Sequence, residues 1–237
     1  MKQWFKGENS GQTYLILNFE ISSYCNADCP SCFRTMNKSK LPLRHLKVED
    51  FEFLILNNIN FIKNNRYEIQ IAKFCGEVGD PLLHPKIDQL IGIAESVFNR
   101  VEIYTNGGLR NTTWIKNLFR RYGKTRFVFG IDGLSDETNQ MYRVNVRTDI
   151  ALKNMIESAK YRPTRWEYTI FSHNYLELFD VIMFAKKHDL KLLCRFNGRT
   201  FNKLDDENIV KCETLLKKHN TDYYICKEDV RMKKKLK

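Results

Sequence analysis

Three of the chain's seven cysteines fall within eight residues, in the stretch CNADCPSC that contains Cys25, Cys29 and Cys32. Thiolates are soft ligands, and three of them on one short loop suit iron–sulfur or zinc chemistry. A structural zinc site needs four protein ligands, whereas a four-iron cluster held by three thiolates keeps one iron open for another ligand. Residues 14–21, YLILNFEI, predict a strand. The cysteine loop therefore follows the carboxyl end of a strand, where α/β proteins build their active sites.

The cysteine spacing and the preceding residues 20–26, EISSYCN, resemble the radical S-adenosylmethionine (SAM) superfamily. The resemblance implies that Cys25, Cys29 and Cys32 bind a [4Fe-4S] cluster and that SAM is the second cofactor. It also implies the reaction: one electron cleaves SAM to methionine and a 5′-deoxyadenosyl radical, which abstracts hydrogen from a substrate. Ser31 departs from the family pattern, in which many members carry an aromatic residue before the last cysteine.

Two other interpretations of the cysteine loop remain open on the residues alone. One is a zinc-stabilised nucleic-acid-binding module, with His45 or a distant cysteine as the fourth ligand. The other is a degenerate relative that binds a cluster and catalyses nothing. The metal content of the protein separates zinc from iron.

A second candidate element follows the next predicted strand, in residues 74–85, FCGEVGDPLLHP. Two glycines and an acid between a strand and a helix can offer backbone carbonyls and a carboxylate to an ammonium group. In the superfamily a Gly-Gly-Glu turn at this place contacts the SAM amino group. The resemblance assigns this role to Gly79 and Asp80, with aspartate in place of glutamate and Val78 in place of the first glycine.

The ends of the third and fourth predicted strands supply the remaining candidates, Asn106, Gly130, Asp132 and Arg143. The fourth strand resembles the Ser-x-Asp-Gly…Arg arrangement of the peptide-modifying, SPASM-associated branch. The resemblance implies that Arg143 pairs with the SAM carboxylate and that Gly130 replaces the serine of this motif. From the residues alone, Asn106 and Asp132 beside glycines also fit turn-forming roles, and Arg143 also fits a solvated arginine.

Strand-like and helix-like periods alternate along the whole chain, which predicts parallel strands joined by helices. The predicted strands are 14–21, 68–75, 101–105, 127–132, 166–171 and 190–196. The predicted helices are 48–64, 87–98, 111–122, 148–161, 175–188 and 205–218.

Glycines and polar residues decide between a barrel and a doubly wound sheet. Seven of the eleven glycines lie at or just past predicted strand ends, where backbone can approach a ligand. Polar residues alternate with apolar ones along the strands, unlike the apolar interior of a closed eight-stranded barrel. We therefore predict an α/β fold, an open partial (β/α)6 TIM-type barrel with a polar lumen. The predicted lumen residues are Asn18, Glu20, Gln70, Glu102, Tyr104, Asn106, Asp132, Glu167, Thr169, Lys191, Arg195 and Asn197.

The 237 residues predict a lead-in over 1–13, one core over 14–218 and a basic tail over 219–237. No apolar run approaches the ~20 residues of a membrane span, and the first residues do not resemble a signal peptide. We therefore expect a cytoplasmic protein with no membrane partner. After the last predicted strand only Cys212 and Cys226 follow, so the auxiliary-cluster domain of the SPASM branch is not expected.

The formal charge of +11 and the acid-free stretches 34–47 and 110–126 favour anionic partners, nucleic acid among them. The basic residues of 110–126, however, share a helix with an apolar stripe and should face solvent. The predicted lumen mixes acids with bases and is unlike a phosphate channel. We therefore predict a peptide or small-molecule substrate in preference to nucleic acid. The resemblance adds an electron donor such as flavodoxin or ferredoxin.

Overall fold

The computed structural model describes residues 13–37, 40–64, 66–198 and 201–225. Most of the predicted lead-in, residues 1–12, lies outside the described residues. So does the tail from residue 226 onward, which includes Cys226.

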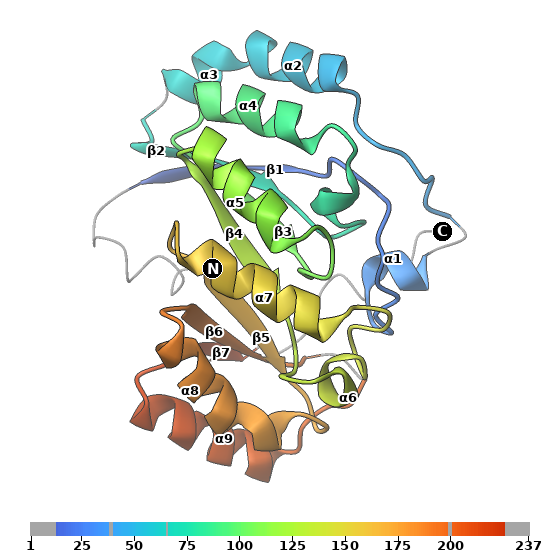
Figure 1. Ribbon diagram of the computed structural model, residues 1–237, viewed down its shortest axis with the longest axis vertical. Helices are drawn as coiled ribbons and strands as arrows, with labels where there is room; N and C mark the ends of the chain where they lie inside the picture. The colour runs from blue at the N-terminus through green and yellow to red at the C-terminus, as the bar shows by residue number, and fades with distance from the viewer. Residues whose placement is uncertain (1–12, 38–39, 65, 199–200, 226–237) are drawn as a thin grey trace.

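Seven parallel strands form one curled sheet whose spatial order is the order of the chain (Figure 1). The strands are β1 Tyr14–Phe19, β2 Ile69–Phe74, β3 Arg100–Thr105, β4 Thr125–Gly130, β5 Arg165–Ile170, β6 Lys191–Phe196 and β7 Asp222–Ile225. The sheet is a half-barrel with helices outside it, so the predicted α/β partial TIM-type barrel is confirmed.

The strand β7 is an addition to the six predicted strands, and it lies in the segment predicted to be tail. It pairs in parallel with β6, and the ring of Tyr223 contacts Phe196 at a centroid distance of 5.9 Å. The run from Tyr223 to Ile225 has strand-forming residues. It is too short to stand out in the sequence beside the basic residues that follow.

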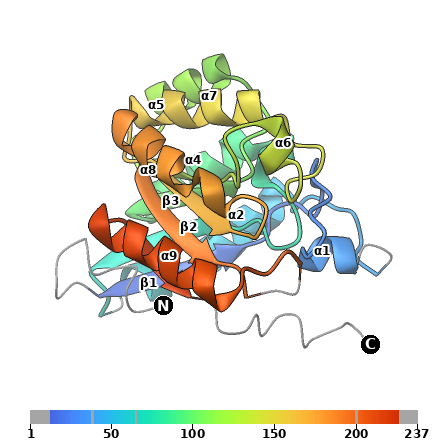
Figure 2. The same ribbon diagram turned by 90° about the horizontal axis from the view of Figure 1, so that it is seen from below.

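Helices cover the convex face of the sheet, as Figures 1 and 2 show for α4, α5 and α7. The longer helices are α2 Val48–Asn57, α4 Ile87–Val97, α5 Thr112–Arg121, α7 Thr148–Ala159, α8 Leu178–Lys187 and α9 Asp206–Lys218. The short ones are α1 Phe33–Met36, α3 Ile59–Lys63, α6 Asp136–Asn139 and the 3-10 turns η1 Pro81–Leu83 and η2 Tyr175–Glu177.

Two helix boundaries show how local residues set these elements. Asn111 caps α5, because its side chain accepts a hydrogen bond from the backbone N–H of Trp114 at 2.9 Å. The single helix predicted over 48–64 is two helices, since Asn58 leaves helical geometry between α2 and α3.

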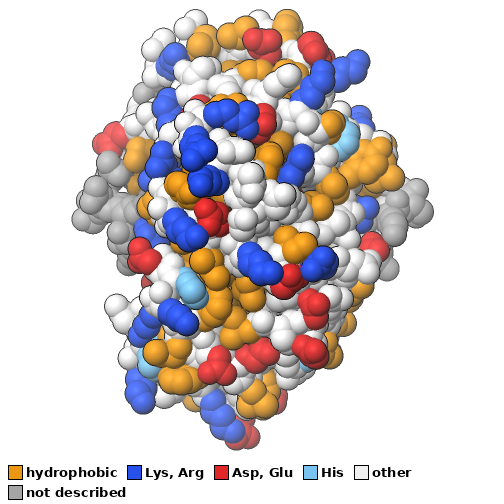
Figure 3. Space-filling model, in the orientation of Figure 1, with side chains coloured by type: hydrophobic (Ala, Val, Ile, Leu, Met, Phe, Trp, Pro, Cys, Tyr) orange, Lys and Arg blue, Asp and Glu red, His pale blue; other side chains and the backbone are white. Residues whose placement is uncertain are grey.

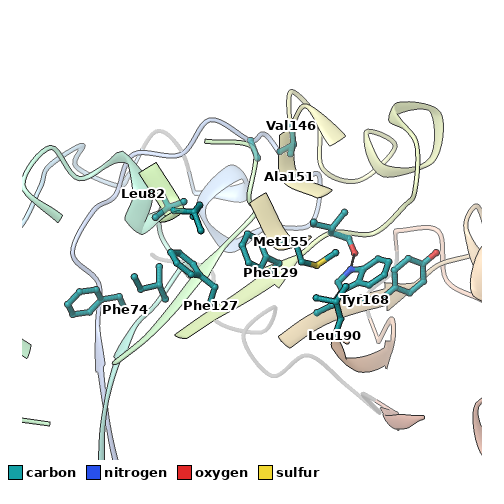
Figure 4. Close-up of a cluster of buried hydrophobic side chains, with 14 of the residues drawn as sticks. Phe74, Leu82, Phe127, Phe129, Val146, Ala151, Met155, Tyr168 and Leu190 are labelled. Carbon is teal, nitrogen blue, oxygen red and sulfur yellow. Dashed lines mark hydrogen bonds between the residues drawn. The ribbon is translucent and has the colours of Figure 1, made fainter. Parts of the chain in front are cut away.

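The hydrophobic core lies between the sheet and its helices (Figure 4). Phe74, Phe127 and Phe129 are at most 1% exposed, and each such side chain contributes roughly 1.5–3 kcal/mol on burial. The polar ends of the buried aromatics are also satisfied. The Trp166 Nε1–H donates to the Ile131 carbonyl at 2.7 Å, and the Tyr168 hydroxyl donates to the Asn174 carbonyl at 3.0 Å.

Alternation along each strand leaves the other set of side chains on the concave face. On β2, Gln70 shares the helix-covered face with Phe74, so its predicted place in the lumen is wrong. Its side chain donates to the Tyr67 carbonyl at 2.7 Å. Lys73 projects from the concave face instead.

Charged side chains are interspersed on the helix-covered face seen in Figure 3. Lys116, Arg120 and Arg121 of α5 are exposed, as predicted, so this basic stretch faces away from the lumen. Within the described ranges, every helix is too short or too polar to cross a bilayer.

Candidate active site

A cavity of about 270 Å³ opens at the carboxyl ends of the strands. The three cysteines of the loop all line it. Five of the six predicted SAM contacts line the same cavity, namely Gly79, Asp80, Asn106, Gly130 and Arg143. The sixth, Asp132, is fully buried directly behind Arg143.

The cysteine loop is held at both ends and in the middle. Arg34, in the short helix after the last cysteine, donates from Nε to the Ser23 carbonyl at 3.2 Å and so joins the two ends of the loop. The backbone N–H of Asp28 donates to the Val144 carbonyl at 3.2 Å, which ties the loop to the segment after β4. The loop therefore presents its thiols from a fixed backbone.

Burial dominates the protonation of Cys25 and Cys29. It raises the pKa of Cys25 to about 12, and it also raises the pKa of Cys29, which the charge of Arg143 opposes. Both thiols are therefore neutral in the metal-free chain at pH 7 and lose their protons on binding a metal.

The donor set and its arrangement fit an iron–sulfur cluster. Three thiols of one loop surround one cavity, which suits a cluster whose irons each take one thiolate. In the described part of the chain no three His, Cys, Asp or Glu side chains converge on a point where one metal ion could bind.

The Gly79–Asp80 turn packs directly against the start of the cysteine loop. A Cβ atom on Gly79 would lie 2.1 Å from the Ser22 carbonyl oxygen and 2.7 Å from that of Tyr24, so only glycine fits. The next backbone N–H, of Asp80, donates to the Tyr24 carbonyl at 2.7 Å. The turn and the cysteine loop are thus one packed unit.

The Asp80 carboxylate points toward the end of β3. It accepts from the Leu82 N–H at 2.9 Å, the Thr105 hydroxyl at 2.8 Å and the Asn106 N–H at 2.9 Å. Burial raises the pKa of Asp80, and these three donors oppose the shift. With its side chain committed in this way, Asp80 offers the cavity chiefly its backbone.

Asn106 both forms a turn and reaches the cysteine loop. Its side-chain oxygen accepts from the Gly108 N–H at 2.9 Å, which is the turn role that its glycine neighbours indicated. Its amide nitrogen donates to the Asn26 side chain at 2.8 Å and lies 3.9 Å from the Cys25 sulfur. Asn106 therefore fixes the first half of the loop.

Arg143 is ion-paired and lines the cavity, and its side chain is 22% exposed. Its Nε donates to Asp132 Oδ2 at 2.7 Å, while Asp132 Oδ1 accepts from the Thr169 N–H at 2.7 Å. Burial alone would lower the pKa of Arg143, but Asp132 and Cys29 raise it, so the guanidinium stays charged. Gly130 makes room for it, because a Cβ there would lie 2.8 Å from Arg143 Nη2.

The structure adds two basic residues to the cavity wall that the sequence analysis did not single out, Arg34 and Lys73. Arg34 is 8% exposed, and its Nη1 lies 3.7 Å from Asp28 Oδ1. Its position two residues after Cys32 was the feature of the sequence that could have identified Arg34 as a cavity residue. Lys73 lies two positions before Cys75, so the two side chains share one face of the extended chain, and this spacing could have placed Lys73 on the concave face.

Comparison with known proteins now decides the family. The model of the radical SAM superfamily matches residues 19–184, more than half of the chain. The chain belongs to the radical SAM superfamily. Membership makes it an enzyme and implies SAM and an iron–sulfur cluster as its cofactors.

Two solved structures share the fold at low sequence identity. Streptococcus suis SuiB bound to S-adenosylmethionine superposes with a TM-score of 0.67 and 16% identity, over 94% of this chain and 53% of SuiB. Native anSMEcpe with bound AdoMet gives a TM-score of 0.67 and 18% identity, over 90% of this chain and 63% of that one. At this level of identity both show the shared fold.

A curated relative comes from Methanocaldococcus jannaschii, a 7,8-dihydro-6-hydroxymethylpterin dimethyltransferase. It is 29% identical over 134 residues, which cover 54% of this chain and 24% of the relative. The chain thus spans about a quarter of the length of this relative and about half that of SuiB.

Proposed function

We propose that Cys25, Cys29 and Cys32 hold a [4Fe-4S] cluster and that the chain is a radical SAM enzyme acting on a bound substrate. A bound cluster would supply the electron for reductive cleavage of SAM to methionine and a 5′-deoxyadenosyl radical, and this radical would abstract hydrogen from the substrate. The observation that supports this best is the shared cavity: three thiols of one loop face the Arg143–Asp132 pair and the Gly79 turn.

Different residues of this chain bind the two oppositely charged groups of SAM, its carboxylate and its amino group. Arg143, which lines the cavity, is the cation for the SAM carboxylate, and Asp132 binds its Nε, which leaves the terminal nitrogens for the ligand. The Gly79–Asp80 turn offers backbone carbonyls to the amino group. Asn106 and Gly130 complete the wall, the first by fixing the cysteine loop and the second by leaving space for Arg143.

The substrate we propose is a peptide or a small metabolite, with flavodoxin or ferredoxin as electron donor. SuiB bound to its precursor peptide SuiA has the same fold, with a TM-score of 0.67, which supports a peptide. The pterin named for the curated relative supports a small molecule. Nucleic acid is the second candidate, favoured only by the basic charge of the chain.

Anaerobic reconstitution tests the proposal. The chain should take up iron and sulfide in equal amounts, turn brown, and release 5′-deoxyadenosine when given SAM and dithionite. Cys29→Ala should lose the colour and the product while it stays folded, because the core does not need metal to bury its apolar faces. Cys212→Ala, a buried cysteine of α9, is the matched control. Zinc in place of iron would overturn the proposal.

A further inference from the structure

A belt of charged and aromatic side chains crosses the concave face of the sheet from β2 to β6. The inner belt consists of Lys73, Tyr104, Arg165, Glu167 and Arg195. The Lys73 ammonium lies 4.0 Å from the centre of the Tyr104 ring, and Arg165 donates to the Tyr104 hydroxyl at 2.6 Å. Arg165 and Arg195 both pair with Glu167.

The cations of the cavity wall differ in how they are paired. Arg34, Arg143 and Arg195 each have a carboxylate within 4.0 Å, in Asp28, Asp132 and Glu167 respectively. Lys73, among the residues that the structure describes, has no carboxylate at this distance. Its ammonium therefore projects into the cavity as a charge without an ion-pair partner.

The nearby carboxylates on the concave face are engaged elsewhere. Glu102 is the register partner of Lys73, yet it pairs with Arg100 at 3.5 Å and Arg165 at 3.7 Å. Glu20 also acts electrostatically on Lys73. Its two oxygens, however, accept from the N–H groups of Glu77 and Val78 at 3.3 and 3.4 Å.

Arg195 supplies a second cation of the cavity wall. Its terminal nitrogen pairs with Glu167, but its buried Nε has no hydrogen-bond partner within the described structure. That nitrogen is closed off from the cavity, so the terminal nitrogens are the part of Arg195 that a ligand can reach. Burial also raises the pKa of Tyr104, so the phenol stays neutral and contributes no anion.

We infer that Lys73 and Arg195 form an oxyanion subsite, which binds a carboxylate or phosphate of the substrate. An oxyanion supplies the negative charge that Lys73 lacks, and Arg195, which lines the same cavity, adds a second positive charge to its wall. Lys73 lies on β2, two positions before the cavity residue Cys75, so the anion would bind deeper in the half-barrel than the cysteine loop. The inference rests on the proposed function, since it names the substrate class of that cavity.

Calorimetry on the reconstituted chain tests the subsite, with saturating SAM so that the Arg143 position is filled. The probes are glutarate for a carboxylate and inorganic phosphate for a phosphate. At least one should bind the wild type, and Lys73→Met should weaken it by tenfold or more. Lys73→Arg, which keeps the charge, should bind nearly as the wild type does. The stronger of the two probes identifies the anion.

The control is Lys86→Met, which removes an exposed lysine beside the turn of η1. It should leave the binding of both probes unchanged. Binding of neither probe, or equal binding by wild type and Lys73→Met, would overturn the subsite. If Lys73→Met does not fold, Lys73→Gln takes its place. Anion binding that depends on Lys73 in a chain that makes no 5′-deoxyadenosine would instead refute the proposed function alone.

Discussion

The guanidinium of Arg143 lies against the α-carbon of Gly130, so close that a Cβ atom on the glycine would be 2.8 Å from Nη2. The position of Gly130 corresponds to a serine in the motif that it resembles. In this chain the space of that side chain is taken by the arginine. The serine side chain of the motif is thus replaced by the guanidinium of Arg143, which contacts β4 directly.

Restoring the serine should harm this site. Gly130→Ser places its Cβ against Arg143 and should displace the guanidinium from the cavity wall. We expect SAM affinity, measured by calorimetry, to fall roughly tenfold, or about 1.4 kcal/mol. Gly123→Ser is the control, because its nearest atom, Arg162 Nη2, lies 3.9 Å away. Unchanged SAM affinity in Gly130→Ser would show that Arg143 does not bind SAM from this position.

The planar shape of Arg143 should matter as well as its charge. Arg143→Lys keeps the charge but cannot both pair with Asp132 and present a fork to a carboxylate. We expect weaker SAM binding with the fold retained. Arg147→Lys changes a 68% exposed arginine a few residues away and should bind SAM normally. Equal SAM affinity in the two variants would assign the carboxylate of SAM to another residue.

Two glycines give opposite predictions for stability. Gly79→Ala puts a methyl group 2.1 Å from the Ser22 carbonyl oxygen and should cost about 3 kcal/mol or more in the free energy of unfolding. Gly92→Ala lies within α4 and meets only Tyr122 at 3.6 Å. It should instead stabilise the chain by about 0.5–1 kcal/mol. Urea unfolding measures both, and a neutral Gly79→Ala would mean that the turn and the loop are not packed as described.

His84 should make stability depend on pH. Burial lowers its pKa, while its ring accepts from the Lys86 N–H at 3.1 Å and contacts the Leu46 carbonyl at 2.8 Å, as a neutral imidazole does. The unfolded histidine, with a pKa of about 6.5, binds a proton before the folded one does. Stability is therefore complete above pH 6.5 and falls as the pH drops below it.

The matched measurement is urea unfolding between pH 5.5 and 7.5. His84→Gln should have the flatter pH dependence, although it loses stability at pH 7.5 with the lost hydrogen bonds. His219→Gln, on the surface after α9, should keep the wild-type slope. A wild-type slope in His84→Gln would assign the dependence to other groups.

The sequence was sufficient for what depends on local pattern. Strand and helix periods predicted the half-barrel, and the spacing of Cys25, Cys29 and Cys32 predicted the loop that lines its cavity. The sequence analysis missed strand β7, because a segment of four residues is too short to show the period of a strand. Its pairing with β6 is a tertiary contact.

Side-chain direction was the harder part. Gln70 and Lys73 are both polar residues of β2, and only the packed core shows which of them faces the helices. Asp80 was assigned to SAM from its motif, yet its carboxylate is bonded to Thr105 and Asn106, 25 and 26 residues away. Contacts between residues so far apart in the sequence depend on how neighbouring strands align, and a local sequence pattern does not contain this information.

The strand order of the sheet has a consequence for biosynthesis. Every strand pairs only with its neighbours in the chain, so each new strand can join the sheet as the ribosome releases it. The cavity cannot be completed in the same stepwise way. The cysteines leave the ribosome first, but Asn106 and Arg143 follow some 80 and 110 residues later. For that interval the nascent chain carries its thiols on an unfinished wall, so we expect insertion of the proposed cluster to follow the folding of the fourth strand–helix unit.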